Sequence, residues 1–159
     1  MSEPSAQNKP QNEVGTESRS LMIGDICEID INMRWADADS LQHLNNAVYF
    51  RYMEEGRISM FYSGKVPHDT GCGPVVVHCA CDFNKQITYP ATIRVRHRLV
   101  RIGRSSMEHE VDLLVIDGEH LDLRAKGRSV LVWMDFEAEK SLPWPTEVLA
   151  ALATTVNRS

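Results

Sequence analysis

The sequence predicts an α+β fold in which an antiparallel sheet is covered by one long helix. Three observations lead to this class: helical spacing of apolar residues over residues 45–63, strand-like alternation before and after that stretch, and short connections between the later strands. With 159 residues, 43% of them hydrophobic, the chain can bury one core. A single helix leaves sheet edges open, so we expect a homo-oligomer that pairs an edge.

The first structured element should be a strand. Residues 1–20 are polar, so we expect a disordered tail ahead of a single domain over residues 21–159. From about Asp25 to Trp35, apolar side chains alternate with polar ones, the period of a half-buried strand. The loop sequence Asp-Ala-Asp-Ser then leads into the helix.

The long helix should run from near Asn45 to Ser63. Asn45 or Asn46 suits the N-cap, and Gly64 stands where a left-handed C-cap is common. Gly56 in mid-helix costs about 1 kcal/mol relative to alanine, so we interpret it as a point of close approach to the sheet. The helical spacing predicts a buried face made of Tyr49, Tyr52, Met53, Gly56, Met60 and Phe61.

Nearly all of the chain after about Pro74 should be strand. Alternating stretches cover residues 75–83, 93–99, 107–115 and 120–134. Asp117-Gly118 is a hairpin turn signal, and Pro143 and Pro145 should break the sheet. Thr146 to Val156 is expected as a short terminal helix.

Composition narrows the class of partners. The formal charge of -5 argues against non-specific nucleic-acid binding, which needs a basic surface. No apolar run approaches the roughly 18 residues that span a bilayer, and no signal peptide is evident, so we expect a cytoplasmic protein without a membrane partner. The four cysteines form no Cys-x-x-Cys pair and are interpreted as reduced core or near-core residues rather than a metal site: Cys27, Cys72, Cys79 and Cys81.

The stretch from Asp37 to Tyr49 is the most informative for function, because it sets ionisable and amide side chains at a strand-to-helix junction. A carboxylate there faces the first turn of the helix, whose unpaired N–H groups and positive dipole end can hold a developing oxyanion. This arrangement suits acyl chemistry and requires no metal or redox cofactor.

From about Glu28 to Pro145 the chain resembles the hotdog-fold acyl-CoA thioesterases of the 4-hydroxybenzoyl-CoA thioesterase family. Four pieces carry the resemblance: the loop Asp37-Ala38-Asp39, Tyr49, the helix segment Glu54-Glu55-Gly56-Arg57, and the strand-turn-strand element over residues 101–106. The string Gln-His-Leu-Asn-Asn after the loop looks more like the subgroup acting on fatty acyl thioesters, including those of acyl-carrier protein.

The resemblance implies an antiparallel sheet wrapped around one long central helix, and a hydrolase of lipid metabolism. It implies that Asp39 attacks the thioester or activates water, and that the backbone N–H near Asn46 polarises the thioester oxygen. His43 would shape the pocket or orient water. The substrate would be an acyl-CoA or acyl-carrier-protein thioester, in a homodimer or homotetramer whose site forms between subunits. The implied substrate-binding residues are Tyr49, Gly103, Arg104, Ser105 and Ser106.

Plainer interpretations exist for several of these residues. Asp39 could be a loop or cap aspartate, and Asp37 is better explained as structural. Glu54 and Glu55 either form a solvated helix face or, as in another branch of the family, supply a catalytic acid. The basic strand residues either face solvent opposite Glu108, Glu110 and Asp112 or, Arg104 above all, bind coenzyme phosphates: Arg94, Arg96, Arg98, Arg101 and Arg104.

Two other classes of function compete with hydrolysis. A non-catalytic acyl-thioester binder could use the same fold, because fold does not fix function. A purely structural oligomer subunit is the third class, although two acids, a histidine and two asparagines at a helix entrance are costly to bury for packing alone.

Overall fold

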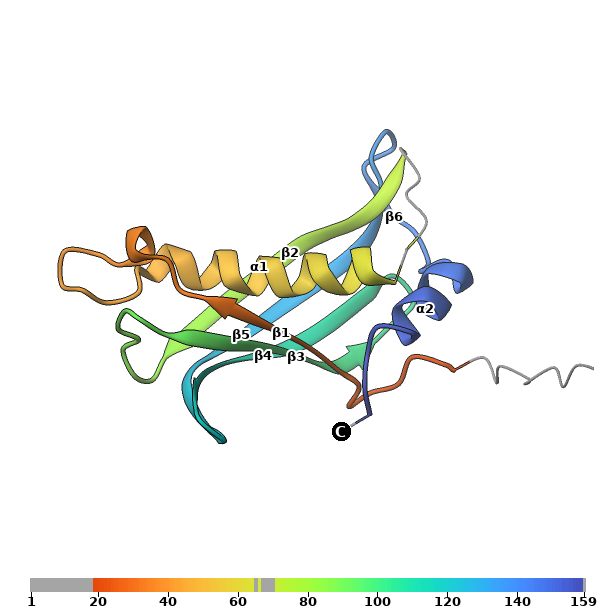
Figure 1. Cartoon of the computed structure of the whole chain (residues 1–159). Helices are drawn as coiled ribbons and strands as arrows, with labels where there is room; N and C mark the ends of the chain where they lie inside the picture. The colour runs from red at the N-terminus through yellow and green to blue at the C-terminus, as the bar shows by residue number, and fades with distance from the viewer. Residues whose placement is uncertain (1–18, 65, 67–70, 159) are drawn as a thin grey trace, which may run out of the picture.

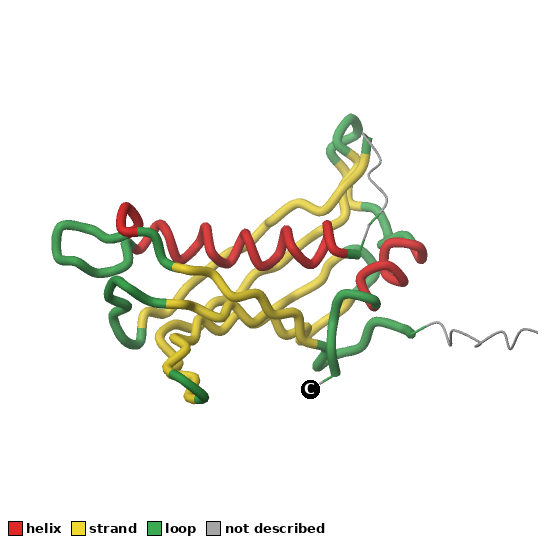
Figure 2. The backbone as a smooth tube through the Cα atoms, viewed as in Figure 1, coloured by secondary structure: helices red, strands yellow, loops and turns green. Residues whose placement is uncertain are grey.

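The computed structural model describes residues 19–64, 66 and 71–158. The predicted tail falls outside these residues except at its end, where Arg19 donates a hydrogen bond of 2.6 Å to the carbonyl oxygen of Val156. One sheet and one long helix dominate the described chain (Figure 1), and most loops lie at the two ends of the sheet (Figure 2).

The sheet has six strands in the order β1-β3-β4-β5-β2, with β6 beside β5, and all neighbours are antiparallel. This is the hotdog architecture that the sequence predicts. Its strands are β1 (Ile26–Asn32), β2 (Cys72–Phe83), β3 (Thr92–Ile102), β4 (Ser106–Asp117), β5 (His120–Asp135) and β6 (Lys140–Ser141). The helices are the 3-10 turn η1 (Trp35–Asp37), α1 (Asn46–Ser63) and α2 (Thr146–Ala153).

Two predicted elements end earlier than expected. Strand β1 stops at Asn32 because Trp35–Asp37 turns into η1, where the Asp37 carboxylate accepts a hydrogen bond from the Arg34 amide. Helix α2 stops at Ala153 because the following chain returns to the sheet, where Asn157 forms a bridge with Ile26. The two-residue strand β6 was not predicted.

Helix α1 has the predicted N-cap and buried face. The Asn45 side chain accepts a 2.9 Å hydrogen bond from the Ala47 amide, and all six residues predicted on the inner face are buried. The left-handed cap at Gly64 is wrong, since its φ is -73°. A Cβ on Gly64 would lie 2.9 Å from the carbonyl oxygen of Ala151, so this glycine allows α2 to approach rather than the backbone to reverse.

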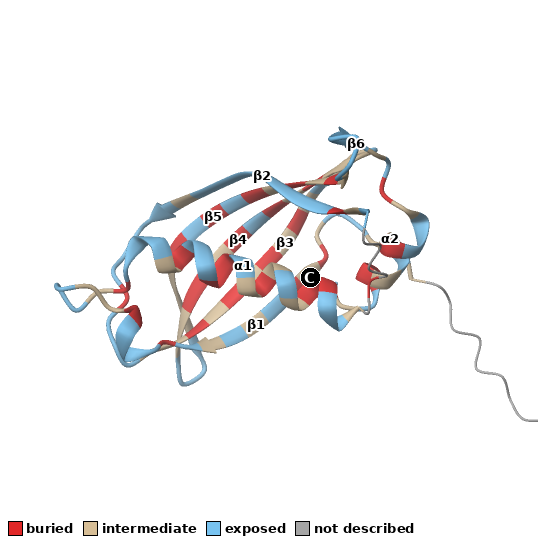
Figure 3. Cartoon of the chain, turned by 90° about the horizontal axis from the view of Figure 1, so that it is seen from above, coloured by how far each residue is buried: buried red, intermediate tan, exposed pale blue. Residues whose placement is uncertain are grey.

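Gly56 confirms the predicted close approach of helix and sheet. A Cβ at this position would lie 2.8 Å from His97 Nε2 and 3.1 Å from Val95 Cγ1, both on β3. Seen from above, α1 crosses directly over the buried central strands (Figure 3). The glycine therefore sets how closely the helix packs on the sheet.

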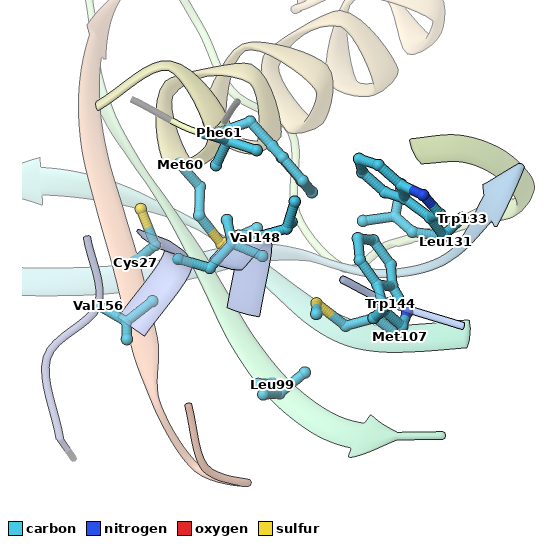
Figure 4. Close-up of a cluster of buried hydrophobic side chains, with 12 residues drawn as sticks. Cys27, Met60, Phe61, Leu99, Met107, Leu131, Trp133, Trp144, Val148 and Val156 are labelled. Carbon is cyan, nitrogen blue, oxygen red and sulfur yellow. The ribbon is translucent and has the colours of Figure 1, made fainter. Parts of the chain in front are cut away.

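The buried apolar residues form two clusters. One lies beneath the first half of α1 and includes Tyr52 and Met53; the other joins the end of α1 to α2 and includes Phe61, Trp133 and Trp144 (Figure 4). His97 and His109 are also buried but belong to neither cluster. The core therefore contains a buried polar pair, which the apolar pattern alone does not predict.

Cys27 is buried as expected, and Cys72 and Cys81 are partly buried. Cys79 is exposed, so its interpretation as a core or near-core residue is wrong. The reason is its place on β2, the last strand of the sheet order, which pairs on one side only and exposes most of its length. The apolar side chains exposed on this edge strand are Val75, Val76, Val77 and Phe83.

Candidate active site

The loop between η1 and α1 is organised by the Asp39 carboxylate. Its Oδ1 accepts hydrogen bonds from the Leu41 amide at 2.8 Å and the His43 amide at 3.1 Å. The Asp39 amide donates in turn to the His43 carbonyl oxygen at 2.8 Å, and Gln42 takes a positive φ of 64° to close the turn. Within the described chain Oδ2 accepts no hydrogen bond, so one carboxylate oxygen is left for chemistry.

The loop is tied to the neighbouring segment before β3. The Leu44 amide donates a 2.8 Å hydrogen bond to the carbonyl oxygen of Ile87, and His43 forms a bridge with Thr88. His43 is half-buried and follows Asp39 by four residues. These contacts fix the backbone around the carboxylate without burying it.

Asp37 has a different environment from Asp39. Its carboxylate is 4% exposed and is held by the Tyr52 hydroxyl at 2.7 Å, the Arg34 amide at 3.0 Å and the Arg51 guanidinium. Burial works to raise the pKa of Asp37, but these three hydrogen bonds outweigh burial and hold the pKa below its ordinary value. A carboxylate with both oxygens hydrogen-bonded is a structural anchor for the start of α1, as the sequence suggested.

The first turn of α1 offers a free donor beside the loop. The Asn45 side chain caps Ala47, and the Asn45 carbonyl accepts from Val48. The backbone N–H of Asn46 has no acceptor among the described residues, and it lies at the positive end of an 18-residue helix. Asn46 is exposed. The site therefore combines an open carboxylate oxygen with an unpaired N–H group.

Tyr49 lies one turn further along the helix, with only 2% of its surface exposed. Its ring packs edge-on against Phe83 of β2, with 4.9 Å between centroids, and burial raises the pKa of its hydroxyl. It forms the floor beneath the loop and links the helix start to the end of the edge strand.

The other predicted binding residues lie at the opposite end of the molecule. Gly103 to Ser106 form the turn between β3 and β4, closed by a 2.8 Å hydrogen bond from the Gly103 amide to the Ser106 carbonyl. The Trp144 amide binds the Arg104 carbonyl at 2.9 Å, which places this turn beside α2 (Figure 1). A single chain therefore does not bring residues 103–106 together with Asp39.

Arginines of β3 form ion pairs on the surface of the sheet. Arg94 and Arg96 pair with Asp30 and Glu28 of β1, at 2.8 and 2.5 Å. The strand register places Arg96 opposite Asp112 and Arg98 opposite Glu110 of β4, as expected. The ion pairs of Arg94 and Arg96 are formed with β1, the second neighbour of β3. Of the β4 acids, Glu108 pairs with Arg128 of β5 at 2.6 Å.

A cavity that the sequence did not predict lies between the second half of α1, β2 and the end of β5. Its volume is about 380 Å³, within the range of small-molecule sites. Aromatic and aliphatic side chains form most of the wall, with Arg57 and Glu54 at one end. The wall includes Ile58, Phe61, Val76, Leu131, Trp133 and Phe136.

The helix acids have weak partners. Glu55 lies 3.9 Å from Arg51, and Glu54 lies 3.9 Å from Arg57.

In the described part of the chain no three histidine, cysteine or acidic side chains are placed to hold a metal ion. No helix there is long and apolar enough to cross a membrane.

An antiparallel sheet against one long helix, with an acidic loop at the start of that helix, defines a hotdog protein. The chain belongs to the thioesterase-like superfamily, whose sequence profile matches residues 33–152. This membership supports thioester hydrolysis as its general activity, and it confirms the resemblance to hotdog thioesterases.

Individual proteins are similar to this chain in sequence or in fold. The PA2801 protein of Pseudomonas aeruginosa is 32% identical, with a TM-score of 0.73 over 80% of this chain and 98% of that one. The YsmA protein of Bacillus subtilis (strain 168) is 27% identical over 128 residues, which are 79% of this chain and 84% of that protein. A 1,4-dihydroxy-2-naphthoyl-CoA thioesterase from Synechocystis shares the fold, with a TM-score of 0.72 at 14% identity over 80% of this chain and 95% of that one.

Proposed function

We propose that the protein hydrolyses a fatty acyl thioester of coenzyme A or of acyl-carrier protein to the free acid and the thiol. The observation that supports this most is the pairing of a free Asp39 Oδ2 with an unpaired Asn46 N–H at the positive end of α1. The carboxylate either attacks the thioester carbonyl or removes a proton from water that does so. The thiolate leaves and is protonated. On the nucleophilic route an acyl anhydride with Asp39 remains, and water hydrolyses it to release the free acid and restore the carboxylate; on the general-base route the attacking water gives the free acid directly.

Each residue of the loop has a distinct part in this reaction. The Asn46 N–H donates to the carbonyl oxygen as it becomes an oxyanion, at the place where the helix dipole favours negative charge. The amides of Leu41 and His43 hold Asp39 Oδ1, so that Oδ2 points away from the turn. His43 shapes the pocket or orients the water, because its own backbone is fixed by Asp39 and Thr88.

The active form is a homodimer or a tetramer of such dimers, with the site between subunits. Strand β2 presents a 12-residue edge with exposed apolar side chains, the kind of edge that pairs with another strand. Two β2 strands paired antiparallel about a two-fold axis place the α1 start of one subunit beside the α1 end of the other. The α1 end also carries the cavity and the turn Gly103–Ser106. In the dimer, Asp39 of one subunit therefore lies beside the cavity and turn of the other.

In this arrangement the turn Gly103–Ser106 contacts the coenzyme or carrier arm, and Arg104 meets its phosphates. Arg104 is exposed, its backbone carbonyl accepts from the Trp144 amide, and its guanidinium pairs with no carboxylate among the described residues. A guanidinium with free donors is suited to phosphate. Tyr49 supports the acyl end of the substrate from below.

The test compares Asp39→Asn with wild type in a thiol-release assay on palmitoyl-CoA. Loss of the carboxylate should reduce hydrolysis on the order of 10²-fold or more while the fold remains intact. Equal turnover by both proteins would rule out Asp39. Binding of acyl-CoA in calorimetry by wild type, without any thiol release, would instead favour a non-catalytic acyl-thioester binder.

Asp37→Asn is the matched control, since it makes the same chemical change two residues away. It should lower the free energy of unfolding by about 1–2 kcal/mol, because Arg51 and Tyr52 lose a charged partner that is partly screened by solvent on the Arg51 side. Hydrolysis by the folded fraction should change little. If the folded Asp37→Asn protein lost as much activity as Asp39→Asn, the loss of hydrolysis could not be assigned to the Asp39 carboxylate alone.

A further inference from the structure

The cavity beside the second half of α1 combines apolar walls with one half-buried cation, Arg57. Phe61 of α1, Trp133 of β5 and Phe136 after β5 line it. The Phe136 ring also covers Gly73, where a Cβ would lie only 2.8 Å from the ring, so the glycine keeps room for the aromatic side chain. Such walls suit a hydrocarbon chain.

Arg57 forms the inner end of this cavity and lacks a close partner. Its side chain is 12% exposed. In the described chain its sole carboxylate neighbour is Glu54, at 3.9 Å, and the Glu54 side chain is 55% exposed. Burial lowers the pKa of Arg57 below its ordinary value. A guanidinium has five N–H donors, and one distant carboxylate leaves most of them unused.

The groups next to Arg57 are buried and polar. His97 Nδ1 and His109 Nδ1 are buried, and neither has a hydrogen-bond partner among the described residues. Burial, followed by the nearby charge of Arg57, lowers the pKa of His109 to about 4. These side chains are neutral at neutral pH, so they do not neutralise the cation. Within the described chain the positive charge of Arg57 is therefore offset only by Glu54, a mostly exposed carboxylate 3.9 Å away.

The proposed dimer sets the direction in which a substrate enters. The two-fold axis brings Asp39 of one subunit to the outer end of the partner's cavity, near Gly73 and Phe136. When the thioester carbonyl lies at that point, the acyl chain runs inward along Phe61 and Trp133. The far end of the chain then contacts Arg57. The cavity volume of about 380 Å³ holds about a dozen non-hydrogen atoms at roughly 30 Å³ each.

We propose that Arg57 determines substrate specificity by binding a carboxylate at the far end of the acyl group. The preferred substrate is then the monothioester of a medium-chain dicarboxylic acid. This inference rests on the proposed thioester hydrolysis, and it specifies the acyl group. A carboxylate fits because it accepts two parallel hydrogen bonds from a guanidinium, and the apolar wall accommodates the methylenes between the two ends.

The experiment compares decanoyl-CoA with the monothioester of decanedioic acid, which differ only at the far end of the chain. The ratio of their kcat/KM values is measured by thiol release for wild type and Arg57→Met, with calorimetry of free decanoate and decanedioate as a readout independent of catalysis. Wild type should hydrolyse the decanedioyl thioester in preference to decanoyl-CoA, and it should bind free decanedioate more tightly than Arg57→Met does. Arg57→Met should reduce that preference about 10- to 100-fold, the loss expected for a charge-assisted hydrogen bond.

Three further variants sharpen the result. Arg57→Lys keeps the charge and should keep part of the preference. Glu54→Gln removes the carboxylate that competes for Arg57, so it should increase the preference for the decanedioyl thioester. Arg128→Met makes the same change as Arg57→Met on the outer face of the sheet, where Arg128 pairs with Glu108, and should leave the ratio as in wild type.

The outcomes separate this inference from the proposed function. Equal ratios for wild type and Arg57→Met, with both thioesters hydrolysed, would overturn the role of Arg57 and leave hydrolysis standing. No hydrolysis of either thioester, with decanedioate bound at least tenfold more tightly by wild type than by Arg57→Met, would support the carboxylate site and refute hydrolysis. If neither thioester were hydrolysed and wild type and Arg57→Met bound decanedioate equally, both the carboxylate site and the proposed hydrolysis would be refuted.

Discussion

Acidification should destabilise the protein through its two buried histidines. His97 Nε2 donates a 3.0 Å hydrogen bond to the Met53 carbonyl oxygen, and the His97 and His109 rings meet edge to face at 5.6 Å. Burial lowers the pKa of His97 to about 3 and that of His109 to about 4, from 6.5. Both imidazoles are therefore neutral in the folded protein at pH 5, whereas both are protonated in the unfolded chain.

The sign and size of the effect follow from proton linkage. Between pH 6.5 and pH 5 the unfolded state binds up to two more protons than the folded state, so stability falls as pH falls. At pH 5 each imidazole lowers the free energy of unfolding by about 2 kcal/mol, and the pair by about 4 kcal/mol. A typical domain has about 5–15 kcal/mol in total, so the loss is large. Carboxylates contribute little in this window, because they titrate mainly below it.

Urea unfolding of wild type and His109→Leu at pH 7.5 and pH 5 measures this loss. The variant should lose about half as much stability on acidification as wild type, since it keeps only His97. Replacing His109 costs little at pH 7.5, because its Nδ1 has no hydrogen-bond partner to lose. An equal loss in both proteins would refute the assignment of acid sensitivity to the buried pair.

Two further predictions concern packing and assembly. Gly56→Ala should lower the free energy of unfolding by about 1–2 kcal/mol, because overpacking against His97 and Val95 costs more than the roughly 1 kcal/mol gained in helix propensity; greater stability in urea would contradict it. Val77→Lys, at a side chain 56% exposed on β2, should shift the oligomer toward monomer in sedimentation velocity, and an unchanged mass would place the interface elsewhere.

The sequence determined much of the fold because the relevant signals are local. Asn45 capped the helix as predicted, and the spacing of Tyr49, Met53 and Met60 identified the buried face. Gly56 alone indicated that α1 packs closely on the sheet, since a glycine in mid-helix is unfavourable unless it allows a close contact. Asp39 and Asn46 could be singled out as candidates because a strand-to-helix junction has unpaired amides whatever surrounds it. Their catalytic role stays a prediction.

Only the tertiary structure decided which elements lie side by side. The strand order places β1 against β3 and β5 against β2, so Arg94 pairs with Asp30 and Cys79 falls on an exposed edge. It also brings Arg57 and Phe136, 79 positions apart along the chain, to one cavity. Periodicity indicates which face of a helix or strand is buried. Which other element packs against that face depends on contacts between distant parts of the chain, and no local pattern encodes those contacts.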